Sequence, residues 1–140
     1  MQLYLIQAIV TWILFGLILT VQIVHYPIFL FLNTVDAFKF HQVKISYLVM
    51  PLMLIELGTA VYLLIRDWTP FFVINGINLA LVIIIWVITF TLMVPLHQRL
   101  TRMPEKKDIE SLIKYNWLRT MAWMVKSLLW GGIIWHLIST

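Results

Sequence analysis

The chain has 140 residues, of which 62% are hydrophobic and only 11% are charged, and its mean hydropathy of +0.95 excludes an ordinary soluble domain. It contains no cysteine, which excludes disulfides, thiolate metal sites and cysteine nucleophiles. The formal net charge is +4, but with so few charged residues a nucleic-acid partner is not expected. The composition predicts an integral membrane protein in contact with the lipid bilayer.

Four apolar runs are each long enough to cross a membrane, because a helix needs roughly 20 residues to span about 30 Å of hydrocarbon. They cover approximately residues 3–26, 45–65, 71–96 and 117–139. The first run follows no basic region and is too long for a cleaved signal peptide, so we expect it to remain. With no internal repeat, residues 1–140 are predicted to form one domain, an all-α antiparallel four-helix transmembrane bundle.

Basic residues gather in the connections after the first and third runs, and only Arg66 lies on the opposite side. Because lysine and arginine stay on the cytoplasmic side, both termini are expected outside a plasma (inner) membrane. Residues 104–114 read as a short amphipathic helix resting on the cytoplasmic interface. The basic residues of these connections are Lys39, Lys44, Arg99, Arg102, Lys106, Lys107 and Lys114.

Each run carries polar residues at steps of three and four, which keeps them on one helix face, with an apolar residue on some turns. Polar groups are costly in hydrocarbon, so these faces should turn inward and give the bundle a polar interior. The four stripes are Gln7, Thr11, Ile18, Gln22 and His25; His41, Ile45, Leu48, Leu52, Glu56 and Thr59; Asn75, Asn78, Trp86, Thr89, Met93 and His97; and Asn116, Arg119, Trp123, Lys126 and Trp130.

Depth along the stripes predicts two polar groups. Glu56 and Lys126 fall near mid-bilayer, where an isolated charge is expensive, so they are expected to pair, whether for structure alone or for function. A second group should lie at the cytoplasmic end, close to the helix-interrupting Pro27 and Pro95. Its expected members are His25, His41, His97, Asn116 and Arg119.

Three histidines at one level leave two chemical interpretations open. His25, His41 and His97 could bind zinc or iron, or two of them a haem, although no short ligand spacing favours this. Alternatively a neutral histidine acts as an acid or base without a cofactor. His136, near the outer surface, is expected to be an interfacial residue, and Trp86 and Trp123 are expected to line a flat apolar pocket.

Three segments carry a family resemblance: "VHYPIF" at residues 24–29, "VPLHQRL" at 94–100 and "LIKYNWLRTMAW" at 112–123. They resemble the small four-helix membrane proteins of the anthrone-oxygenase-like family. In that family a His-Pro element follows helix 1, an asparagine usually follows the proline of helix 3, and an arginine opens helix 4. The matching positions are His25 with Pro27, His97, and Arg119; this chain departs in inserting Tyr26 and in having histidine at 97.

The resemblance implies an oxygenase or oxidoreductase that oxidises a flat hydrophobic, anthrone- or quinone-like molecule with oxygen and no evident cofactor. His25 or His97 would act as the base, Arg119 and Asn116 would stabilise an oxyanion, and Trp123 would stack on the ring. The residues expected to line the substrate site are Gln22, Tyr26, His41, Trp86 and Trp123. Two alternatives remain: a small proton-coupled carrier acting as a homo-oligomer, with Glu56, Lys126 and the histidines as its relay, and a small subunit of a larger membrane complex.

Overall fold

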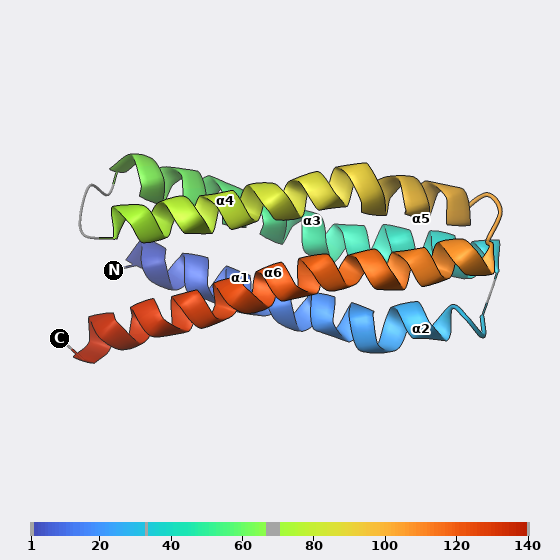
Figure 1. The fold of residues 1–140 in the computed structure, drawn as a ribbon, viewed down its shortest axis with the longest axis horizontal. Coiled ribbons are helices and arrows are strands. Elements are labelled where there is room, and N and C mark those ends of the chain that lie inside the picture. The colour runs from blue at the N-terminus through green and yellow to red at the C-terminus, as the bar shows by residue number, and fades with distance from the viewer. Residues whose placement is uncertain (1, 33, 67–70, 140) are drawn as a thin grey trace.

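The bundle consists of four long helical stretches that run antiparallel, with both termini at one end (Figure 1). The computed structural model describes residues 2–32, 34–66 and 71–139, and this part of the chain contains no strand. The four stretches, Gln2–Ile28, Val35–Arg66, Phe72–Leu100 and Lys106–Ser139, are each long and apolar enough to cross a membrane. The protein is therefore an all-α, multi-pass membrane bundle, as its composition predicts.

The first and third stretches share an interruption. The first consists of α1 (Gln2–Thr20), the wide turn η1 (Val21–His25) and α2 (Tyr26–Ile28). The third consists of α4 (Phe72–Ile88), the wide turn η2 (Thr89–Met93) and α5 (Val94–Leu100). Each wide turn ends just before a dipeptide whose second residue is proline, Pro27 or Pro95. Because proline has no N–H to donate, the regular helical ladder cannot continue there, and a π turn absorbs the change.

The second and fourth stretches are single helices, α3 (Val35–Arg66) and α6 (Lys106–Ser139). The prediction of a separate surface helix at residues 104–114 is wrong, because α6 begins at Lys106 and residues 106–114 form its first turns. Ile109 and Leu112 are buried in the bundle rather than lying on the interface. They stand in phase with Asn116, Arg119 and Trp123 farther along the helix, and no breaker separates them, so one continuous helix buries the whole stripe.

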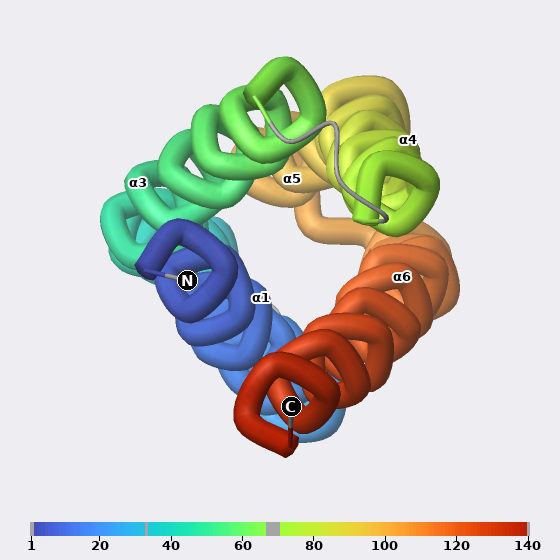
Figure 2. Tube along the Cα trace, turned by 90° about the vertical axis from the view of Figure 1, so that its left-hand side faces the viewer, coloured from blue at the N-terminus to red at the C-terminus, as the bar shows by residue number. Residues whose placement is uncertain are grey.

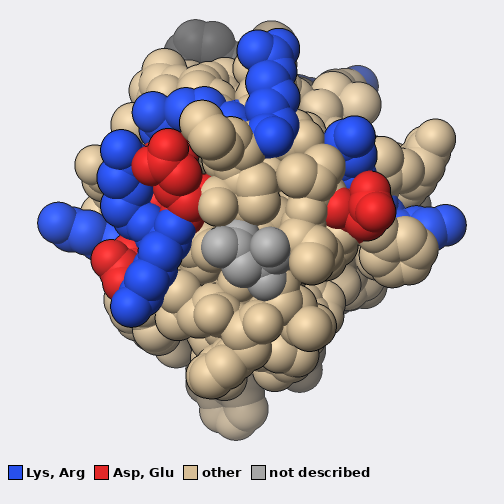
Figure 3. All heavy atoms as spheres, turned by 90° about the vertical axis from the view of Figure 1, so that its right-hand side faces the viewer, with Lys and Arg blue, Asp and Glu red and all other residues tan. Residues whose placement is uncertain are grey.

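Around the bundle, α1 lies between α3 and α6, and α4 closes the ring on the other side (Figure 2). The core has three apolar clusters along its length, built around Trp130, Trp123 and Phe38. Many large apolar side chains outside the core are exposed, which is the surface that lipid covers. Lysine and arginine side chains gather at the end opposite the termini, with aspartate and glutamate side chains among them (Figure 3).

Candidate functional site

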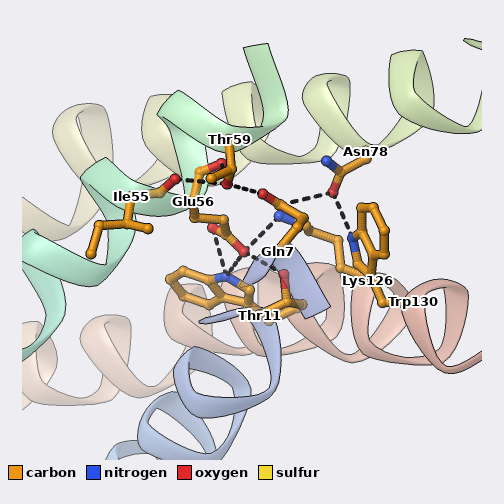
Figure 4. Close-up of polar contacts among 9 residues, drawn as sticks. Gln7, Thr11, Ile55, Glu56, Thr59, Asn78, Lys126 and Trp130 are labelled. Atoms are coloured by element: carbon orange, nitrogen blue, oxygen red, sulfur yellow. Dashed lines mark hydrogen bonds and ion pairs between the residues drawn. The ribbon is translucent and has the colours of Figure 1, made fainter. Parts of the chain in front are cut away.

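A closed ion pair lies in the middle of the bundle. Lys126 Nζ lies 2.6 Å from Glu56 Oε1, and both side chains are fully buried. Thr11 Oγ1 donates to the same oxygen at 3.0 Å, and Trp123 Nε1 donates to both carboxylate oxygens at 3.2 Å (Figure 4). We call these four residues the central cluster. The structure brings Glu56 and Lys126 together as their depth led us to expect, and it adds Thr11 and Trp123 as partners that the sequence did not identify.

Amide and indole groups extend this polar interior toward the termini. Asn78 Oδ1 accepts from Trp130 Nε1 at 3.0 Å and from Gln7 Nε2 at 3.5 Å. Thr59 donates its hydroxyl hydrogen to Gln7 Oε1, and Figure 4 shows these side chains converging between the helices. Uncharged hydrogen bonds between four helices fix their register, so this region holds the bundle together.

Arg119 is a charged residue in the half of the polar interior that lies away from the termini. Its Nη1 donates to Asn116 Oδ1 at 3.4 Å, and Asn116 Nδ2 donates to Gln22 Oε1 at 2.7 Å. The guanidinium carbon lies 5.2 Å from the Trp123 ring centroid. Arg119 is only 5% exposed, its Nε has no hydrogen-bond partner, and no carboxylate of the described residues pairs with it. Since arginine keeps its charge in proteins, Arg119 is a buried cation to which the described residues offer no counter-ion.

His97 lies at the same level as Arg119. Its Nε2 is 3.0 Å from the Tyr26 hydroxyl oxygen, and its Nδ1 is buried without a partner. The His41 ring lies 6.1 Å from the His97 ring and 5.3 Å from the His25 ring, measured between centroids. The structure therefore brings the three histidines together at one end of the bundle. Tyr26 is the residue of its turn that faces inward, and it lies against His97.

His25 itself is displaced from the inward stripe that the sequence predicts. It is only half-buried, whereas Tyr26 next to it is 2% exposed. The cause is the wide turn η1, in which the Tyr26 N–H bonds to the Val21 carbonyl, five residues back. This turn holds one more residue than an α-helical turn, so the inward position passes from residue 25 to residue 26.

A cavity of about 100 Å³ opens beside Arg119, between α3 and the third stretch. We call it the Arg119 cavity. Tyr26, His97 and Arg119 supply its main polar groups. Its other walls are Gln42, Ile45, Ser46, Val49, Met50, Met53, Thr89, Met93 and Val94. A mostly apolar pocket with a few convergent polar groups is the usual form of a small-molecule site.

A second cavity, of about 330 Å³, lies on the other side of α3, between that helix and the end of the first stretch. We call it the His25 cavity. His25 and His41 line it together with Lys44, so the structure divides the histidine group between two cavities. Its remaining walls are Ile28, Phe29, Ala37, Phe40, Ile45 and Leu48.

Several expectations are not matched by this geometry. Gln22, Asn116, Trp86 and Trp123 are not among the residues that line the Arg119 cavity, and His41 lines the His25 cavity instead. The Trp86 ring lies 5.5 Å from Phe90, and Trp86 packs against the apolar cluster around Trp123. The alternative of a bound metal also lacks its ligand set, because in residues 2–32, 34–66 and 71–139 no three histidine or carboxylate side chains form a group that could hold an ion.

Comparisons with protein-family models, with curated proteins and with solved structures give no match. The function is therefore inferred from the resemblance of three segments to a known family and from the residues of this chain. Among them, the unpaired Arg119 and the two cavities are the features that packing alone does not explain.

Proposed function

We propose that the protein is a membrane-embedded oxygenase that binds a flat aromatic ketone in the Arg119 cavity and oxidises it with dioxygen. The observation that carries the proposal is the buried Arg119 guanidinium, which no carboxylate in the described part of the chain neutralises. A buried cation costs several kcal/mol unless it is paired and hydrogen-bonded. A ligand oxygen that is a carbonyl in the bound state and an enolate during reaction would supply the missing acceptor to Arg119.

His97 is the proposed base. In the tautomer whose Nε2–H donates to the Tyr26 oxygen, Nδ1 carries a free lone pair, and no other side chain of the described residues occupies it. Tyr26 is then a positioning residue that accepts this hydrogen bond and holds the ring orientation. With His97 and Arg119 lining one cavity, proton removal and charge stabilisation act on the same ligand.

The chemistry is balanced with dioxygen as the oxidant. His97 takes a proton from the activated methylene carbon of the ketone, and Arg119 holds the resulting enolate oxygen. The carbon then forms a bond to dioxygen, and cleavage of the O–O bond with loss of water leaves a second carbonyl. The methylene carbon loses four electrons, which reduce dioxygen to one carbonyl oxygen and one water. The resemblance to the anthrone-oxygenase-like family supplies this substrate class.

The cavity has to enlarge for a ligand of several rings, because about 100 Å³ accommodates roughly one ring. Its walls suit such a change. Met50, Met53 and Met93 line it, and methionine side chains are unbranched and flexible enough to repack around a ligand. At its rim Ser46 is exposed and Val94 half-buried, so the rest of the ligand extends between α3 and α5 toward lipid.

The basic end of the bundle is the proposed cytoplasmic side of a plasma membrane, since lysine and arginine are retained there. A substrate dissolved in the lipid then reaches the Arg119 cavity from the cytoplasmic leaflet. The carrier alternative is less well supported, because Glu56 and Lys126 neutralise each other and are fully enclosed by Thr11 and Trp123.

Two ligands that differ in one carbonyl group test the proposal. Detergent-purified protein should bind anthrone and leave 9,10-dihydroanthracene, which lacks the acceptor oxygen, essentially unbound. It should also consume dioxygen and produce anthraquinone faster than buffer or the Arg119→Met protein does, measured with an oxygen electrode and by absorbance. Equal binding of the two ligands, or equal oxidation rates with and without Arg119, would contradict the proposal.

A further inference from the structure

The His25 cavity is a second site, separate from the one that the proposed function uses. It combines three basic side chains with apolar walls, and none of the residues that line it is acidic. We propose that it binds an anionic phospholipid, with the phosphate beside Lys44 and His41 and an acyl chain along the apolar wall. Basic pockets between transmembrane helices are a known way to bind acidic lipid headgroups.

The cavity lies at the depth where headgroups meet hydrocarbon. α3 has 32 residues, about 48 Å at 1.5 Å per residue, so a hydrocarbon layer of about 30 Å leaves about 9 Å of helix at each end. His41 and Lys44 lie about 9 Å and about 14 Å from the start of α3 at Val35. His41 therefore lies at the boundary and the Lys44 backbone lies about 5 Å inside it, and the flexible lysine stem can bring the ammonium back to the phosphate level.

The walls of the cavity continue onto the lipid-facing surface. Ile28, Phe40 and Leu48 line it and are also exposed, by 44%, 67% and 56%. A cavity with such a rim opens sideways to the bilayer, where an acyl chain already lies. Lys44 is exposed at the same rim, with its Nζ 5.7 Å from the Phe40 ring centroid.

The histidines supply the deeper polar contacts. His25 Nδ1 and His41 Nε2 are buried atoms without hydrogen-bond partners, and their rings meet edge to face at 5.3 Å. Each imidazole can donate to a phosphate or glycerol oxygen, which neither can find among the apolar walls. The cavity thus offers one cation, two hydrogen-bonding rings and an apolar slot, which together match an anionic amphiphile.

The test uses the full-length protein in detergent and native mass spectrometry with added phosphatidylglycerol or phosphatidylcholine. Phosphatidylglycerol should bind more tightly, and Lys44→Gln should weaken it about fivefold, since one lysine near the membrane surface contributes about 1 kcal/mol. The matched control is Lys39→Gln, an exposed lysine of the same helix that does not line the cavity. It should leave the affinity unchanged.

Three results would overturn the proposal. The first is equal affinity for the two lipids, and the second is an equal loss in the Lys39 and Lys44 variants, which would indicate a diffuse surface charge. The third is displacement of the lipid by millimolar inorganic phosphate, which would make the site one for a free anion.

Because Lys44 is exposed, its substitution leaves the fold intact, and an unchanged thermal unfolding midpoint verifies this. Anthrone binding at the Arg119 cavity should stay unchanged, so this proposal and the proposed function fail separately.

Discussion

Two buried cations lie on α6, and their surroundings differ. Lys126, in the central cluster, lies 2.6 Å from a carboxylate that also accepts from Thr11 and Trp123. Arg119, two turns away, has one long hydrogen bond to Asn116 and a free Nε beside a cavity. Trp123 links the two regions: it donates its N–H to Glu56, the partner of Lys126, and its ring lies under the Arg119 guanidinium.

The difference in surroundings indicates that Lys126 belongs to a structural site and Arg119 to a candidate ligand site. A buried charge that meets its counter-ion and its hydrogen bonds inside the protein leaves nothing for a ligand to supply. A buried charge with no counter-ion and only one long hydrogen bond lowers the stability of the empty protein, and a ligand with an acceptor oxygen recovers that cost on binding. Substitutions at the two sites should therefore change different properties. Breaking the Lys126 pair should lower the free energy of unfolding, and removing Arg119 should lower the affinity for the ligand.

The largest effect is expected from Glu56→Gln. This change leaves the Lys126 ammonium buried and unpaired, and breaking such a pair costs about 3–5 kcal/mol of unfolding free energy. Unfolding followed by circular dichroism in mixed micelles should show the loss. The double variant Glu56→Gln with Lys126→Met should recover part of it, because the stranded charge is gone. If the double variant is only as stable as the sum of the single changes, the pair contributes nothing to folding.

Arg119→Met should affect binding instead. A hydrogen bond to a charged group contributes about 1.5–3 kcal/mol, so anthrone affinity should fall about 10- to 100-fold. Unfolding free energy should stay level or rise, because an unpaired buried charge is replaced by an apolar side chain of similar length. Ligand titration measures the change in anthrone affinity, and thermal unfolding of the same preparation measures the change in stability. A large loss of stability would show that Arg119 has a structural role like that of Lys126.

The sequence predicts much of this comparison, because helix phase and depth are local properties. Glu56 and Lys126 fall at mid-bilayer by residue count alone, and His97 and Arg119 fall at one end by the same reasoning. The fold class follows from four apolar runs, and it is confirmed by four helices long enough to span a membrane. These predictions need only the 3.6-residue period and the thickness of a bilayer.

The rest depends on how helices are interrupted and how they pack. A π turn before Pro27 moves the inward position from His25 to Tyr26, and nothing in the periodicity specifies whether a proline is accommodated by a kink or a wider turn. The separation of His25 from His97 into two cavities follows from this shift and from the placement of α3 between them. Thr11 was recognised as inward-facing, but its bond to Glu56 depends on the relative height of two helices.

A smaller effect is expected from Tyr26→Phe. It removes the hydroxyl that lies 3.0 Å from His97 Nε2 and keeps the ring, so a single hydrogen bond of about 1 kcal/mol is lost. The oxidation rate should fall about three- to tenfold, while anthrone affinity changes less, because Tyr26 positions the base and the ligand is held by Arg119. Steady-state kinetics separate kcat from KM. A rise in KM alone would place Tyr26 in ligand contact.

The smallest effect is expected from His25→Ala, although the sequence makes His25, beside His97, a candidate for the catalytic base. His25 is half-buried and lines the His25 cavity, and the His41 ring lies between its ring and that of His97 in the Arg119 cavity. Its removal should change unfolding free energy by less than about 1 kcal/mol and leave anthrone binding as in the wild type. His97→Ala, measured beside it, should abolish oxidation. If His25→Ala also abolishes oxidation, the rings of His25, His41 and His97 act together and the two cavities form one functional site. The conclusion that the π turn places His25 in a separate site would then be wrong.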